Sequence, residues 1–104
     1  RIVSANDELN KISLKLKEKN INLIVLVVPD KYDFYYEDIL NSPYPKPIFY
    51  SVFDNLEKEY LYFNPKKILA TRKDSVKDLY FVDDTHWSPI SSKIIAEKIS
   101  TLIK

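Results

Sequence analysis

The chain has 104 residues, of which 45% are hydrophobic and 30% charged, a composition typical of one small globular domain or a portion of a larger one. Its net charge is +1 and its lysines are interleaved with acids, which argues against a nucleic-acid partner. The chain lacks glycine and cysteine, which excludes glycine-rich phosphate loops, disulfides and thiolate metal sites. No apolar run is long enough to span a membrane.

The first elements predicted are an amphipathic helix and a strand. A capping-box-like start at residues 4–7 precedes apolar residues at helical spacing, and Asn20 is a suitable C-terminal cap. The apolar positions of this helix are Leu9, Ile12 and Leu16. Residues 21–28 are β-branched and almost continuously apolar, which predicts a central strand covered on both faces, as in a parallel sheet.

The segment after this strand begins at Pro29, where the carboxyl end of a central strand opens into a ligand crevice. Lys31 and Tyr32 are therefore candidate substrate contacts. The alternative is a solvated turn followed by aromatic residues that pack the loop down. Three prolines within residues 42–47 then predict an irregular surface connection.

The second half of the chain repeats the order of helix and strand. An apolar helical face is expected from residue 48 to residue 56, a short strand or extended link over residues 60–63, and a capped helix over residues 64–70. Residues 78–82 are predicted to form a short buried strand. A final amphipathic helix is expected to begin at Ser88, the N-cap, followed by proline at its first position.

The turn between the last strand and the last helix holds the only histidine of the chain, His86. Asp84 lies two residues before it, so in an extended segment both side chains project to one face. A carboxylate that holds one ring nitrogen leaves the other free to take a proton from a serine hydroxyl, as in a hydrolase triad. Asp83 can play the same part if the turn is tight, and spacing alone leaves both aspartates open.

A structural explanation of the same residues stands beside the catalytic one. A lone histidine near a helix start is often a satisfied structural residue, and acidic residues before a helix often favour its N-terminus. Ser91 and Ser92 lie within the first turns of the last helix and lack the strained turn of a nucleophile, so they are interpreted as polar residues of the helix start.

The motif Asp84-Thr85-His86-Trp87-Ser88-Pro89, together with Val28-Pro29-Asp30-Lys31-Tyr32 about fifty residues earlier, resembles the SGNH-hydrolase-like O-acetyltransferase family, which contains the alginate acetylation enzymes of the bacterial periplasm. The resemblance implies that Asp84 and His86 are a catalytic pair that works with a serine from a Gly-Asp-Ser block. Asp83 matches the Asp-x-x-His spacing of ordinary SGNH esterases and is the second choice. Trp87 is then a structural or substrate-side neighbour.

One departure from the family pattern concerns the nucleophile. Without glycine the 104 residues contain no Gly-Asp-Ser block, and the asparagine and glycine of the usual oxyanion hole have no counterpart. The chain also lacks methionine, including at its first position, as expected of a piece of a longer protein. The serine block is expected in a segment outside this sequence, upstream or downstream, and the chain alone is expected to be inactive.

These observations predict an α/β fold, with residues 1–104 forming a single domain or a portion of a three-layer SGNH/flavodoxin-like domain with a mostly parallel sheet and flanking helices. The resemblance implies an acyl-ester hydrolase or O-acetyltransferase of the cell envelope, with an acylated polysaccharide as substrate, a membrane-bound acyl-donor protein as partner and an extracytoplasmic location. No cofactor or metal is needed for this chemistry. A non-catalytic glycan- or protein-binding module that retains the fold is the alternative.

Overall fold

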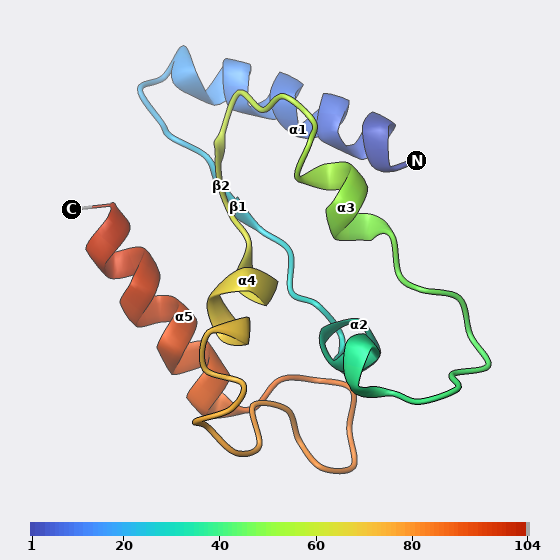
Figure 1. Cartoon of the computed structure of the whole chain (residues 1–104). Helices are drawn as coiled ribbons and strands as arrows, with labels where there is room; N and C mark the ends of the chain where they lie inside the picture. Colours follow the sequence, from blue (N-terminus) through green and yellow to red (C-terminus); the bar gives the residue numbers. More distant parts are fainter. Residues whose placement is uncertain (104) are drawn as a thin grey trace. The chain divides into compact units, whose positions relative to one another are not determined.

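A computed structural model describes residues 1–103, which form helices and a small parallel sheet, the α/β fold class that the sequence predicts (Figure 1). The described residues form two compact units. Unit 1 combines Arg1–Leu26 with Pro47–Phe63. Unit 2 combines Val27–Lys46 with the described residues from Asn64 onward. Each unit is built from two stretches of chain that are distant in sequence.

Unit 1 begins with helix α1 (Ile2–Lys17). The predicted start at residues 4–7 is wrong, because the helix already begins at Ile2 and Ser4 lies inside it, with its hydroxyl donating to the carbonyl of Arg1 at 3.0 Å. The C-cap of α1 is Glu18 and not the predicted Asn20, but Asn20 lies in the turn that closes the helix end, where the N–H of Ile21 donates to the carbonyl of Leu16 at 3.0 Å. Asn20 has a φ of 59°, a left-handed conformation that asparagine tolerates and that allows the chain to close the helix end.

The face that α1 buries agrees only in part with the predicted apolar stripe, of which Leu9 and Leu16 are half-buried. Its buried residues are Asn6 and Ser13, whose side chains donate to the carbonyls of Glu57 and Glu59 at 2.9 and 2.7 Å. Ile12, in the middle of the predicted stripe, is 47% exposed. The helix is therefore attached through side-chain hydrogen bonds to an irregular segment, since buried backbone carbonyls need donors.

The sheet of unit 1 consists of β1 (Ile24–Leu26) and β2 (Leu61–Phe63), which pair in parallel with Ile24 opposite Leu61. The strand predicted over residues 21–28 is shorter than expected, and its faces are not both covered, since the residues of β1 are exposed or half-buried and none is buried. The predicted strand at residues 60–63 is confirmed by β2. Helix α3 (Phe49–Phe53) lies within the predicted helix. Buried aromatic residues form the interior of the unit: Tyr50, Phe53 and Tyr60.

Unit 2 contains helix α2 (Lys31–Tyr35), the 3-10 helix η1 (Tyr36–Asp38), helix α4 (Pro65–Ala70) and helix α5 (Pro89–Leu102). The helices α4 and α5 lie side by side (Figure 1). Both were predicted from their caps, and Asn64 accepts a hydrogen bond from the backbone N–H of Lys67 at the start of α4. The core of the unit consists of Phe34, Leu69, Leu79, Tyr80, Ile94 and Ile95.

The predicted strand at residues 78–82 is wrong, although part of it is buried as expected. Leu79 and Tyr80 are in the core, but the only pairing here is an isolated antiparallel bridge between Tyr80 and Trp87. Val82 is 78% exposed. The reason is that the chain turns back after Tyr80 and pairs with itself, so the segment becomes the stem of a loop.

Candidate active site

The candidate catalytic residues lie on one loop, residues 79–88, which we call the Asp-His loop. Its base is closed by the backbone N–H of Ser88, which donates to the carbonyl of Leu79 at 2.8 Å. One step further out, the N–H of Phe81 donates to the carbonyl of His86 at 3.1 Å. These bonds make the loop a short antiparallel turn that leads into α5. Its base is at Leu79, in the core, and the residues at its tip are exposed.

Two serine hydroxyls strengthen the base of this loop. The Oγ atoms of Ser88 and Ser91 donate to the carbonyl of Leu79 at 3.0 and 2.5 Å, and both serines are buried. Ser88 occupies the N-cap position of α5 as predicted, but its hydroxyl bonds to Leu79 and not to the helix. Ser91 is a polar residue of the helix start, as interpreted from the sequence, and its bond anchors the loop to α5.

Asp84 and His86 contact each other in the exposed part of the loop. The Nδ1 atom of His86 lies 2.6 Å from Oδ1 of Asp84, and the backbone N–H of His86 donates to the same oxygen at 3.1 Å. These two hydrogen bonds, that of the imidazole first, lower the pKa of the Asp84 carboxyl below its ordinary value. The carboxylate therefore fixes one ring nitrogen while the imidazole, 80% exposed, remains accessible.

The two aspartates of the motif are not equivalent in this geometry. Asp84 supplies the oxygen bonded to Nδ1 of His86, whereas Asp83, directly before it, is exposed on the same loop. In the part of the chain that the structure describes, the Asp-x-His spacing thus forms the contact and the Asp-x-x-His spacing does not. The reason is local, because Oδ1 of Asp84 also reaches the N–H two residues on, as in an Asx turn.

A surface pocket of about 330 Å³ adjoins the pair. It is lined by residues of the two sequence motifs, Val28–Asp30 and Thr85–Trp87. Trp87 packs against the core of unit 2 and pairs with Tyr80, so its ring is held in place while it borders the pocket. An aromatic ring beside a carboxylate and an imidazole offers an apolar face and polar groups to a ligand.

The other two predicted contact residues, Lys31 and Tyr32, have partners within the protein. The ammonium of Lys31 donates to the carbonyls of Phe81 and Val82, both at 2.8 Å. The hydroxyl of Tyr32 lies 2.8 Å from the hydroxyl of Ser42 and holds the proline-containing loop. The structure therefore brings Lys31 to the Asp-His loop and directs Tyr32 to a different segment.

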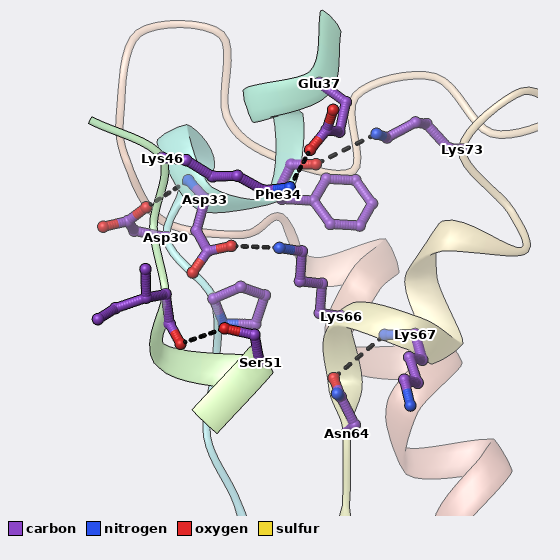
Figure 2. Close-up of polar contacts among 12 residues, drawn as sticks. Asp30, Asp33, Phe34, Glu37, Lys46, Ser51, Asn64, Lys66, Lys67 and Lys73 are labelled. Atoms are coloured by element: carbon purple, nitrogen blue, oxygen red, sulfur yellow. Dashed lines mark hydrogen bonds and ion pairs between the residues drawn. The ribbon is translucent and has the colours of Figure 1, made fainter. Parts of the chain in front are cut away.

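Helix α2, which carries Lys31, is held in unit 2 by charged groups (Figure 2). The carboxylate of Asp30 caps the helix by accepting from the N–H of Asp33 at 2.8 Å. Asp33 in turn pairs with Lys66 of α4 at 2.5 Å. Lys73 donates to the carbonyl of Phe34 at 3.1 Å (Figure 2). Together these contacts give α2 a defined place beside the loop that it contacts.

Some supporting residues were not identified from the sequence. The hydroxyl of Tyr80 donates to the carbonyl of Pro29 and thereby joins the two motifs, and its burial raises the pKa of that hydroxyl. A tyrosine in an apolar run resembles any core residue, so its sequence carries no signal of this bond. Ser88 and Ser91 had a signal, their spacing of three at a helix start, but it points to the helix and not to Leu79.

Within residues 1–103, no group of three or more histidine, cysteine or acidic residues is placed to bind a metal ion. None of the helices described has the length and hydrophobicity needed to cross a lipid bilayer.

The fold is of the α/β class, and the Asp-His loop carries a carboxylate–imidazole pair of the kind that hydrolase triads use. The family model for the SGNH hydrolase-like domain of acetyltransferase AlgX matches residues 1–104, so the chain belongs to this family. The resemblance inferred from the two motifs is thereby confirmed. Searches of curated proteins and of solved structures gave no match.

Proposed function

We propose that this chain supplies the Asp84–His86 half of a Ser-His-Asp triad that transfers or hydrolyses acetyl esters on an extracytoplasmic polysaccharide. The observation that carries the proposal is the 2.6 Å contact between Nδ1 of His86 and Oδ1 of Asp84, on an exposed loop of an SGNH-like domain. The pocket beside Trp87 supports it, because a ring of a glycan can stack there next to the imidazole.

In the proposed mechanism Asp84 accepts the Nδ1–H of His86, which leaves Nε2 to act as the base. A serine from a segment outside these 104 residues loses its proton to Nε2 and attacks the acetyl carbonyl carbon. The bond between that carbon and the donor oxygen breaks, and the proton returns from Nε2 to the leaving oxygen. A sugar hydroxyl or water then attacks the acetyl-serine by the same steps in reverse. The acyl donor is a membrane-associated protein in this proposal.

The first test compares an activated acetyl ester assay on the full-length protein carrying this domain and on residues 1–104 alone, each with and without a serine-directed inhibitor. We expect turnover by the full-length protein only, and its loss on inhibition, because the base alone provides little rate enhancement without the nucleophile and oxyanion hole. Absence of turnover in both would contradict the proposal.

The second test separates the roles of the motif residues in the full-length protein. We expect His86→Ala to lower kcat/KM by about 10³-fold or more, since a positioned base contributes about 10²–10⁴-fold. Asp84→Asn should cause a loss of about 10³-fold, because the orienting carboxylate is removed. Asp83→Asn is the matched control and should change kcat/KM less than about threefold. Equal losses for both aspartate variants would refute the assignment of Asp84.

A second candidate function is a non-catalytic glycan- or protein-binding module. The observation that favours it is the pocket bordered by Trp87, whose ring offers an apolar face to a bound glycan or peptide. This function predicts polysaccharide binding that is lost in Trp87→Ala but unchanged in His86→Ala. An enzyme would instead lose turnover in His86→Ala while retaining its affinity for the polysaccharide.

A further inference from the structure

The Asp-His loop needs a tether, because its tip has little packing of its own. Residues 81–86 are all exposed, and Val82 is 78% exposed. An exposed loop with few apolar contacts opens easily, and a loosely held acid-base pair is a poor catalyst. The backbone bonds of the loop extend from Leu79 and Ser88 to the Phe81 N–H, which donates to the carbonyl of His86, but the carbonyls of Phe81 and Val82 accept from the ammonium of Lys31.

Lys31 bonds to this loop on both of its sides. Its ammonium donates to the carbonyls of Phe81 and Val82 at 2.8 Å, before the aspartates. Its backbone N–H donates to the carbonyl of Thr85 at 3.1 Å, between Asp84 and His86. One residue of α2 therefore spans the segment that carries the catalytic pair, and the orange loop passes beside α2 in Figure 1.

We propose that Lys31 is a positioning residue, which holds the Asp-His loop in the conformation that aligns Asp84 with His86. The catalytic consequence of this inference rests on the proposed function, but the contacts of Lys31 with the loop are present in the protein without substrate. The sequence suggested that Lys31 contacts substrate, whereas in the structure its ammonium binds to the loop. Two of the three donors of its ammonium are used within the protein, and both acceptors are backbone carbonyls of the loop.

The charge and length of the side chain explain why a lysine suits this position. An ammonium is a compact charge on a flexible four-carbon stem, so it can reach two adjacent carbonyls at once. Hydrogen bonds from a charged donor are stronger than neutral ones. The neighbouring Asp30 caps α2, and Asp33 pairs with Lys66, so the helix that bears the tether is itself anchored in unit 2 (Figure 2).

The test uses Lys31→Met, which keeps the stem and removes the charge, Lys31→Arg, which keeps a donor, and Lys46→Met as control. Lys46 is an exposed lysine that pairs with Glu37 at 3.2 Å. In the free protein, the titration of the Asp84 carboxyl is followed by NMR. We expect the pKa of this carboxyl to rise towards its ordinary value in Lys31→Met, because a released loop loses the contact with His86, and to be restored in part by Lys31→Arg.

In the full-length protein the same variants are assayed with an activated acetyl ester. We expect Lys31→Met to lower kcat by about 10-fold to 100-fold with KM nearly unchanged, which is the effect of a misplaced catalytic group. Lys46→Met should behave like the wild type in both measurements. An increase of KM alone, with an unchanged Asp84 titration, would show that Lys31 contacts substrate and would overturn the inference.

The two measurements distinguish a failure of the proposed function from a failure of the tether. If the wild-type protein shows no turnover, the proposed function fails, while the Asp84 titration still decides whether Lys31 tethers the loop. If turnover is present but neither kcat nor the titration changes in Lys31→Met, the tether is refuted and the proposed function is unaffected. Circular dichroism of each variant shows whether the helices are retained.

Discussion

Asp84 and His86 form an exposed pair whose geometry depends on the local backbone. Contacts between exposed charged groups contribute little to stability, because water screens them and both side chains lose freedom. Here one carboxylate oxygen accepts from both the imidazole and the backbone N–H of His86, so the loop conformation selects the rotamer of Asp84. The pair is therefore held for orientation and adds little to the stability of the fold.

This geometry predicts how the pair responds to pH. Because the folded-state pKa of Asp84 is lowered, mainly by the hydrogen bond from the His86 side chain, the contact is present above the ordinary aspartate pKa and is lost as the pH falls through the lowered value. In His86→Ala we expect the midpoint of the Asp84 titration, followed by carboxyl NMR, to rise. Asp83→Asn is the control and should leave it in place. An unchanged midpoint in His86→Ala would show that the imidazole is not the partner.

The elements around the site are short, and their positions depend on specific polar contacts. Helix α2 has only five residues, too few to be stable by itself in water. It is held by the cap at Asp30, by the pair of Asp33 with Lys66, and by Phe34 in the core. The side chain of Asp33 is only 12% exposed, so its charge needs this partner more than a surface carboxylate does.

A double-mutant cycle on Asp33 and Lys66 tests this contribution. We expect each alanine substitution to lower the free energy of unfolding by about 1–3 kcal/mol, and the coupling energy of the pair to be about 1 kcal/mol or more. The control cycle uses Glu37 and Lys46, a pair with side chains 73% and 67% exposed, for which about 0.5 kcal/mol or less is expected. The measurement is urea-induced unfolding. Equal coupling in both cycles would contradict the importance of burial.

At the scale of the whole molecule, the described chain has two units, each with its own interior. The interior of unit 1 is aromatic, with Tyr50, Phe53 and Tyr60. The core of unit 2 contains Leu79, fully buried at the base of the Asp-His loop. Since the same residue ends the core and begins the loop, the stability of unit 2 and the geometry of the site are coupled through Leu79.

Leu79→Ala tests this coupling. A cavity in a fully buried position costs about 2–5 kcal/mol, so we expect a loss of this size in the free energy of unfolding of unit 2. Hydrogen exchange should show faster exchange across the core of unit 2. Leu40→Ala is the matched control, because Leu40 is 88% exposed and its substitution should change stability by about 0.5 kcal/mol or less. Similar effects of the two substitutions would refute the role assigned to Leu79.

Several features of the fold were predictable because they depend on short-range chemistry. Asn20 lies in the turn that follows α1, since asparagine tolerates a positive φ, and Asn64 and Ser88 precede prolines that begin α4 and α5. The structure of residues 78–82 was not predictable, because an apolar run has the same pattern in a strand as in the buried stem of a loop. The stripe predicted on α1 was only partly right for a different reason, since Asn6 and Ser13 are buried by hydrogen bonds to partners that are distant in sequence.

The candidate site shows the same division. From the sequence, the two motifs suggested the family that the family model confirms, and the spacing of an extended segment allowed His86 to contact one of the two preceding aspartates. The choice of Asp84 over Asp83 came from the local conformation of the loop, and the contact of Lys31 with the loop came from the tertiary structure. The sequence could not show the contact of Lys31, because it depends on which carbonyls approach an ammonium about fifty positions away, and such contacts arise only when the elements pack.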